Sequence, residues 1–121
     1  MAYYNDFLMR QISDLSRFLA KALFLKSTKS VELFDEEGNL LESGLLLRRL
    51  KTMIGEGEIN EAEDLLFEKL EESGAPEYEN VALLFYEELQ KLDDETLKQA
   101  NYSREEILEG LEAIQKKFLA W

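Results

Sequence analysis

The chain has 121 residues, a formal net charge of −12, no His and no Cys. Lacking both residue types, it cannot build an imidazole–metal site, a thiolate nucleophile or a Ser-His pair. Its acidity argues against nucleic-acid binding, because that affinity rests on cationic side chains that neutralise phosphates. The length fits one domain, 1–121, whose core needs no metal or disulfide.

Apolar runs along the chain are short. None approaches the roughly 20 consecutive apolar residues that a membrane span needs, and the first residues lack the pattern of an export signal. We therefore expect a cytoplasmic protein with no membrane span. No cofactor and no metal site is predicted.

The first predicted helix covers 6–25, with Asn5 as its N-cap. Its apolar residues spread over an arc of roughly 160°, which is wider than one neighbouring helix covers. The pattern therefore predicts contact with two helices of the domain, or with one helix and another chain. Four large apolar residues extend this coverage and are candidates for self-association: Phe7, Met9, Phe18 and Phe24.

Residues 26–43 break the helical pattern. A polar stretch is followed by the turn Asp35-Glu36-Glu37-Gly38-Asn39, which apolar residues flank. Both a small hairpin and an irregular loop fit this composition, and both interpretations stay open.

Residues 44–74 predict a helical hairpin. Its first helix ends at Gly55-Glu56-Gly57, where glycine favours a left-handed C-terminal turn. Its second helix begins sharply, because Asn60 and Glu63 have the spacing of a capping box. Ser73-Gly74-Ala75-Pro76 ends that helix.

Residues 77–121 predict a second, degenerate helical hairpin. Its first helix, about 77–92, is the most apolar segment and is expected at the centre of the fold. Asp93 or Asp94 caps a short helix, and Ser103 with Glu106 forms a second capping box that opens the last helix. The chain is thus predicted to be all-α, with five to six helices and the N-terminal helix packed across two antiparallel hairpins.

The segment from Gly57 to Ala62, followed by Leu66, resembles the middle of a tetratricopeptide repeat. In that family a turn glycine, a large apolar residue and a small alanine set how closely two helices approach. The match covers about one repeat, and Leu50 and Lys69 stand where small residues are usual. Since a strict period of about 34 residues fails, the resemblance implies tetratricopeptide-like hairpins rather than a repeat array.

Nearly the whole chain also resembles a family of small uncharacterised helical proteins of Gram-positive bacteria, a domain of unknown function. The resemblance is carried by Met9-Arg10-Gln11-Ile12, by Gly57 to Phe67 and by Asn101 to Leu108. It implies an all-helical fold and brings no activity and no catalytic residue.

Acidic residues cluster at several points, among them Glu56 with Glu58, and Asp93-Asp94-Glu95. General acid–base catalysis needs a carboxyl group whose pKa is raised by burial or by a like charge in a cleft, whereas these residues lie at predicted helix ends. The segment from Asp35 fails as an EF-hand calcium loop, because its sixth and twelfth positions are Leu40 and Leu46. No catalytic residue is predicted.

The charges are divided unevenly. Residues 1–30 have five Lys and Arg against two Asp, a net of +3, and the remainder has nine against 24 acids, a net of −15. We expect the first helix to pack on the acidic remainder of its own chain or of a twin. The alternative is a weak contact with an anionic membrane surface.

A compact basic cluster lies in the second helix. If the hairpin stacks as in tetratricopeptide folds, Arg48, Lys51 and Tyr86 line a concave face and meet an acidic or C-terminal peptide. The alternative is that the cations only neutralise neighbouring Glu residues.

The leading hypothesis is a non-enzymatic interaction module that buries a protein or peptide partner, or its own copy, against helical faces. One alternative is a metal-binding protein or an enzyme that uses Asp and Glu alone, which requires at least two carboxylates converging in a pocket. Another is a small-molecule sensor with an apolar pocket between helices.

Overall fold

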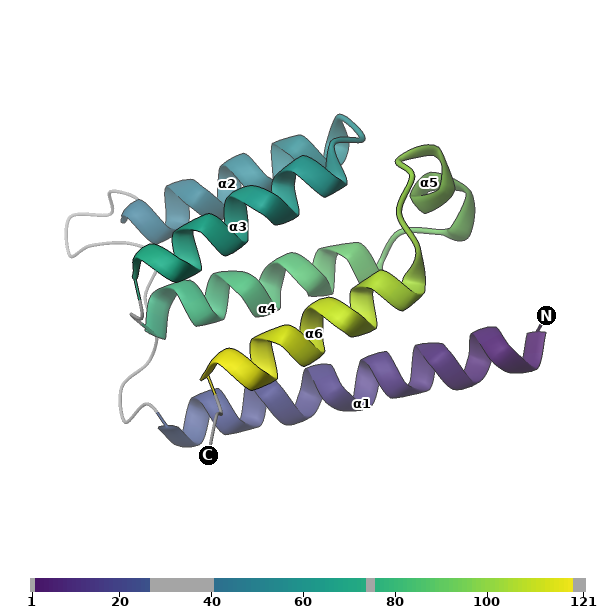
Figure 1. Cartoon of the computed structure of the whole chain (residues 1–121), viewed down its shortest axis with the longest axis horizontal. Helices are drawn as coiled ribbons and strands as arrows, with labels where there is room; N and C mark the ends of the chain where they lie inside the picture. Colours follow the sequence, from purple (N-terminus) through teal and green to yellow (C-terminus); the bar gives the residue numbers. More distant parts are fainter. Residues whose placement is uncertain (1, 27–40, 74–75, 119–121) are drawn as a thin grey trace.

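The computed structural model describes the backbone of residues 2–26, 41–73 and 76–118, and the side chains of 6–23, 41–73 and 77–118. Every regular element in these ranges is a helix, so the predicted all-α class is confirmed. Six helices pack antiparallel in this part of the chain (Figure 1). They are α1 (Ala2–Lys26), α2 (Glu42–Gly55), α3 (Ile59–Glu72), α4 (Pro76–Gln90), α5 (Asp94–Gln99) and α6 (Arg104–Phe118).

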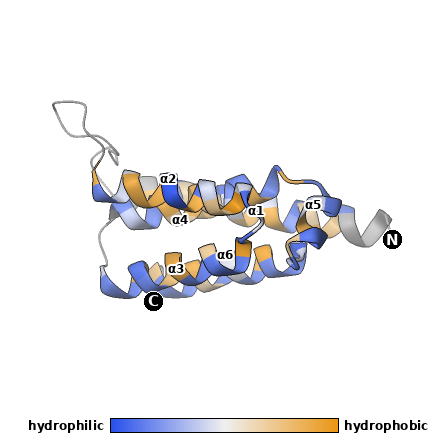
Figure 2. Ribbon diagram, turned by 90° about the horizontal axis from the view of Figure 1, so that it is seen from above, coloured by the Kyte–Doolittle hydropathy of each residue, from blue (hydrophilic) through white to orange (hydrophobic). Residues whose placement is uncertain are grey.

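The five long helices form two layers. Figure 2 shows α2, α4 and α1 in one layer, and α3 and α6 in the other. Helix α4 lies in the middle and contacts α1, α2, α3 and α6. Its inward residues are fully buried, which confirms the prediction that this helix is central: Val81, Ala82, Phe85, Tyr86 and Leu89.

Helix α1 runs along α4 and α6. Its core side is formed by Leu8, Ile12, Leu19 and Leu23, all buried. Helix α1 therefore contacts two helices of the domain, the first of the two predicted alternatives, but Phe7 and Phe18 of the predicted arc stay exposed. Across the α1–α4 contact, Gln90 Nε2 donates a hydrogen bond to Ser16 Oγ at 3.3 Å.

The α2–α3 turn confirms the predicted glycine stop. Gly57 has φ +80°, a left-handed conformation that glycine adopts without steric cost. The Gly57 amide donates to the Ile54 carbonyl and the Glu58 amide to the Met53 carbonyl, at 3.0 and 2.9 Å. This is the Schellman pattern, which satisfies the last carbonyls of α2.

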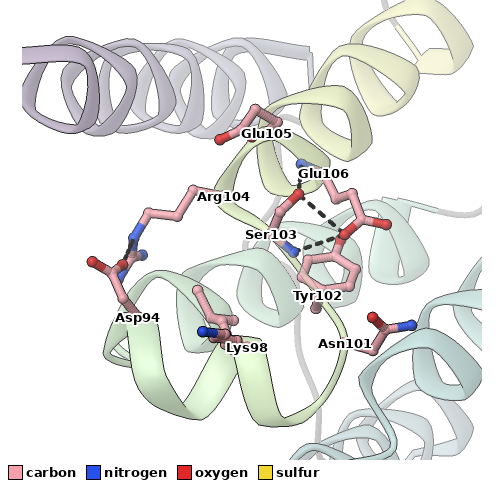
Figure 3. Close-up of a pocket in the computed structure, with 9 residues that line it drawn as sticks. Asp94, Lys98, Asn101, Tyr102, Ser103, Arg104, Glu105 and Glu106 are labelled. Atoms are coloured by element: carbon pink, nitrogen blue, oxygen red, sulfur yellow. Dashed lines mark hydrogen bonds and ion pairs between the residues drawn. The ribbon is translucent and has the colours of Figure 1, made fainter. Parts of the chain in front are cut away.

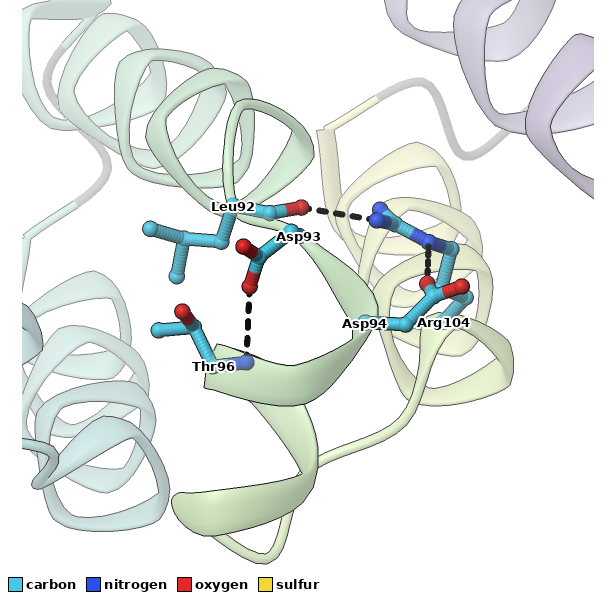
Figure 4. Close-up of polar contacts among 5 residues, drawn as sticks. All are labelled: Leu92, Asp93, Asp94, Thr96 and Arg104. Carbon is cyan, nitrogen blue, oxygen red and sulfur yellow. Dashed lines mark hydrogen bonds and ion pairs between the residues drawn. The ribbon is translucent and has the colours of Figure 1, made fainter.

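The corner between α4 and α6 is held by local polar contacts (Figure 4). The Thr96 amide donates to Asp93 Oδ1 at 2.8 Å, which confirms Asp93 as the cap of α5. Arg104 Nε donates to Asp94 Oδ1 at 2.8 Å, and its Nη2 donates to the Leu92 carbonyl at 2.7 Å. The Arg104 side chain is only 11% exposed. Its guanidinium group links the start of α6 to a residue just after the α4 end and to the first residue of α5.

The start of the first helix was predicted wrongly. Helix α1 already begins at Ala2, so Asn5 lies inside it and is not an N-cap. The physical reason is that nothing in residues 2–4 breaks a helix. The loop or hairpin predicted for 26–43 lies outside the described residues over 27–40, and its bounds were too wide, because α1 includes Lys26 and α2 already begins at Glu42. The segment from Asp35 that was considered for calcium lies outside the described residues up to position 40.

No helix in the described ranges is both long and apolar enough to cross a membrane.

Candidate functional site

Asn60 and Glu63 do not form the predicted capping box. The N-cap of α3 is Glu58, and no side chain caps this helix end. Asn60 Nδ2 instead donates to the Asn101 carbonyl at 3.2 Å and lies 3.5 Å from the Ala100 carbonyl. Because these acceptors belong to the segment after α5, Asn60 fastens α3 to the α5–α6 linker rather than to its own first turn.

Glu63 is the centre of a polar cluster between α3, α4 and the α5–α6 linker. The Tyr86 hydroxyl donates to Glu63 Oε2 at 2.6 Å, and the Tyr102 hydroxyl donates to the same oxygen at 2.7 Å. Tyr86 is fully buried and Tyr102 nearly so. We call these three residues the Glu63 cluster. Hydrogen bonds to an ionised acceptor are stronger than neutral ones, so the cluster holds three elements together.

Burial sets the protonation of the Glu63 cluster. It raises the pKa of Glu63 above the ordinary 4.5, although the two tyrosine hydroxyls oppose this shift by stabilising the carboxylate. Burial and the Glu63 charge raise the pKa of both tyrosines. Both phenols therefore stay protonated and act as donors. The Glu63 carboxylate is bound by two hydroxyl groups of its own chain, which holds α3 against α4 and the α5–α6 linker.

Gly110 leaves the space that Tyr86 occupies. A Cβ atom built on Gly110 would overlap the hydroxyl and ring atoms of the Tyr86 side chain. Helix α6 can therefore approach α4 at this level only without a side chain. Since Tyr86 is held at its far end by Glu63, its ring cannot easily move aside.

A hollow of about 370 Å³ lies beside the Glu63 cluster, between α5, the linker and the first turn of α6. Figure 3 shows that several of its polar side chains already have partners. The Ser103 amide donates to Glu106 Oε2 at 2.7 Å and the Glu106 amide to Ser103 Oγ at 3.3 Å, which confirms the second capping box. Arg104 is bound to Asp94, and Tyr102 to Glu63.

A second hollow, between α1, α4 and α6, has a volume of about 10 Å³. It is lined largely by apolar side chains such as Leu19, Leu83 and Ile114. Such a space is about the size of one water molecule, far below the several hundred Å³ of a small-molecule pocket. Among the described residues, no group of three or more acidic side chains is arranged to hold a metal ion.

The predicted peptide-binding residues do not form one surface. Tyr86 is fully buried and bound to Glu63, so placing it in a surface groove was wrong. The physical reason is that the ring packs inward while Glu63 satisfies its hydroxyl. Arg48 and Lys51 are exposed on α2, and Lys51 Nζ lies 3.7 Å from Glu88 Oε1.

The predicted self-association residues divide over two sides of α1. Phe7 is 60% exposed and Phe18 47% exposed, and at 100° per residue they lie within about 20° of each other. Met9 is 44% exposed but lies about 160° around the helix from Phe7, so it does not share their face. The side chain of Phe24 lies outside the described residues.

Phe7 and Phe18 belong to a continuous exposed stripe along α1. Its spacing alternates between four and three residues, which keeps one face of a helix in register. We call it the outer stripe. Its members, all exposed, are Phe7, Gln11, Asp14, Phe18 and Lys21.

Residues 2–119 match the sequence model of a family of unknown function (DUF6483). The chain belongs to this family. The predicted resemblance to a domain of unknown function over nearly the whole length is thereby confirmed. No curated protein and no solved structure matches the chain.

Sequence reasoning about this DUF6483 chain missed three residues of the Glu63 region: Glu63 as a tertiary acceptor, Tyr102 as its donor, and Gly110. Only Gly110 left a signal. A glycine inside an otherwise regular helix costs up to about 1 kcal/mol relative to alanine, which indicates a close approach of another element.

Proposed function

We propose that this protein is a non-enzymatic interaction module and that the outer stripe of α1 is its docking surface. One observation carries the proposal: two phenylalanines on a single face of α1 are about half exposed, while the apolar residues about a third of a turn away are buried. Large apolar groups that are exposed on one face are a feature of interaction surfaces.

The absence of an enzyme site is part of this proposal. It is supported by the use of Glu63, Arg104 and Glu106 in contacts within the chain. A carboxylate that is already bound to two hydroxyls is poorly placed to bind a substrate proton or a metal ion. Lys51 is less suited to docking, because it already lies near Glu88.

We further propose, on the resemblances of the sequence, that the α2–α3 pair is a tetratricopeptide-like hairpin and that the source is a Gram-positive bacterium. The Gly57 turn and the fully buried Ile59 and Ala62 support the hairpin resemblance. We also propose a cytoplasmic location.

Site-specific photo-cross-linking in cells that produce the protein tests the docking surface. A benzophenone amino acid replaces Phe18 in one variant and Ala20 in the control. Ala20 is also exposed but lies about 160° around α1 from Phe18. We expect a protein adduct from position 18 and none from position 20. Adducts from neither position, or equally from both, would contradict the proposal.

A further inference from the structure

The part of the outer stripe from Phe7 to Phe18 has the same order of aromatic and polar residues in both directions. Along the helix its first four members are aromatic, polar, polar and aromatic: Phe7, Gln11, Asp14 and Phe18. When two copies of such a helix run antiparallel, each aromatic residue faces an aromatic residue, and each polar residue faces a polar one. A surface that complements itself under a two-fold rotation is what an isologous dimer requires.

We propose that two copies of this chain associate through their outer stripes, with the two α1 helices antiparallel. The two-fold axis passes beside Ile12 and Ser13. Phe7 of each chain then packs against Phe18 of the second copy, and Gln11 faces Asp14 of the second copy. This inference rests on the proposed function, because it names the partner that covers the same surface.

The charges on α1 favour the antiparallel orientation. Asp14 lies in the middle of the stripe, where an antiparallel partner brings Arg10 of the second copy to its level. Asp6, near the start of α1, comes to the level of Lys21 of the second copy. In a parallel pair every charge would face its own counterpart, and like charges at close range repel.

Arg17 limits this complementarity, and Asp14 compensates for it. In the antiparallel register Arg10 approaches Arg17 of the second copy. Arg17 Nη2 is 3.0 Å from Asp14 Oδ1 of its own helix, so each meeting of two guanidinium groups includes a carboxylate. The central polar layer therefore determines the register and the aromatic pairs at both ends contribute the buried area.

The overall charge also favours this surface over others for a second copy. The residues after position 30 carry a net charge of −15, whereas residues 1–30 carry +3. Two copies that meet through any strongly acidic face would repel each other, and solvent ions screen this only beyond about 10 Å. Contact through α1 keeps the acidic parts of both molecules apart.

Distances between spin labels on the full-length chain test the orientation directly. The chain has no Cys, so one introduced Cys carries the only label. Met9→Cys and Ala20→Cys suit this purpose, because both residues are exposed and lie about 20° apart on the side away from the stripe. Their lateral separations across the dimer are therefore similar.

The proposed register makes the two label distances unequal. At 1.5 Å per residue, the axial offset between the two copies is roughly 10 Å for Met9 and roughly 22 Å for Ala20. We expect the Ala20 distance to exceed the Met9 distance by roughly 5–10 Å once the similar lateral separation is included. Equal distances would indicate a parallel pair, and a missing dipolar signal would indicate no dimer; both overturn the inference.

A variant pair tests whether the aromatic residues of the outer stripe hold the two copies together, and cross-linking then separates this inference from the proposed function. Phe18→Ser removes one aromatic partner at each end of the seam, and we expect the dimer to dissociate at least tenfold more readily. Ala20→Ser is the matched control and leaves dissociation unchanged. If photo-cross-linking from position 18 captures a different protein while the labels give no dipolar signal, the homodimer is wrong and the docking surface stands.

Discussion

Two segments of this chain have the same local pattern and use it differently. Ile59-Asn60-x-x-Glu63 and Tyr102-Ser103-x-x-Glu106 both have the spacing of a capping box. In the second segment Ser103 and Glu106 bond to each other's amides. In the first, Glu63 binds two tyrosine hydroxyls, 23 and 39 residues away in the sequence. The sequence pattern thus indicates that a capping box can form. The packed neighbours decide whether the glutamate caps its own helix or bonds to another element.

The difference follows from what surrounds each carboxylate. Glu106 lies at the first turn of α6, where the Ser103 amide is its nearest donor. Glu63 lies against α4, where a fully buried Tyr86 hydroxyl requires an acceptor. An unpaired buried hydroxyl costs about 1–3 kcal/mol, more than the roughly 1 kcal/mol that a cap contributes. Glu63 therefore bonds to the tyrosine hydroxyls rather than capping α3.

The largest expected effect concerns the space around Tyr86. Gly110→Ala places a methyl group where the Tyr86 ring and hydroxyl lie. We expect the free energy of unfolding to fall by about 3 kcal/mol, because Tyr86 is held by Glu63 and cannot move freely. Urea unfolding measures this loss. Glu109→Ala, on the exposed side of the same helix, is the control, and an equally stable Gly110→Ala variant would show that Tyr86 has room to move.

Alanine substitution of Glu63 and of Glu106 compares how much each glutamate stabilises the fold. Glu63→Ala leaves two buried hydroxyls without their acceptor and should lower the free energy of unfolding by about 2–3 kcal/mol. Glu106→Ala removes one side of a cap and should cost about 1 kcal/mol. Equal losses in urea unfolding would contradict the distinct roles of the two residues.

Removing the Tyr86 hydroxyl measures how much its hydrogen bond to Glu63 stabilises the fold. Tyr86→Phe should lower the free energy of unfolding by about 1.5 kcal/mol, since it deletes a bond to an ionised acceptor. The same change should cost clearly less in the Glu63→Ala background, whereas it should cost the full amount in the Glu106→Ala background. Additive losses in both backgrounds would show that the Tyr86–Glu63 bond contributes nothing.

The smallest expected effect is a pH dependence. Burial raises the pKa of Glu63 in the folded chain above 4.5, so the folded state binds its proton more tightly than the unfolded state does. Its contribution to the free energy of unfolding therefore falls as the pH rises from about 4.5 through the folded pKa. Glu63→Gln has no such titration, and the other carboxylates are common to both proteins.

Urea unfolding of the wild type and Glu63→Gln between pH 4.5 and 7 checks the sign. The stability of the variant relative to the wild type should increase with pH across this window. A difference that stays constant, or that decreases, would show that the pKa of Glu63 is not raised in the folded state.

Local signals in the sequence predicted the described elements well. The Asp93 cap, the Ser103–Glu106 box and the Gly57 turn were all identified, because their partners lie within about five residues. The central position of α4 followed from its continuous apolar pattern. Such features depend on short-range geometry and form as predicted where no packed neighbour competes for the same side chain, as Tyr86 does for Glu63.

The sequence did not predict where Tyr86 points or what Glu63 binds. A tyrosine has an apolar ring and a polar end, so its position on a helix does not tell whether its hydroxyl meets water or a buried carboxylate. The spacing of the outer stripe could be counted in advance, but the exposure of Phe7 and Phe18 required the packed structure. Met9 was grouped with them although it lies on another side of α1.

Sedimentation equilibrium of the wild-type chain over a range of concentrations tests most directly whether two copies of the chain associate through α1. The account predicts a mass that rises from 14.1 kDa toward twice that value, and a Phe7→Ser/Phe18→Ser variant that stays at the mass of one chain. A wild type that keeps the mass of one chain at every concentration, or a variant that associates equally well, would contradict it.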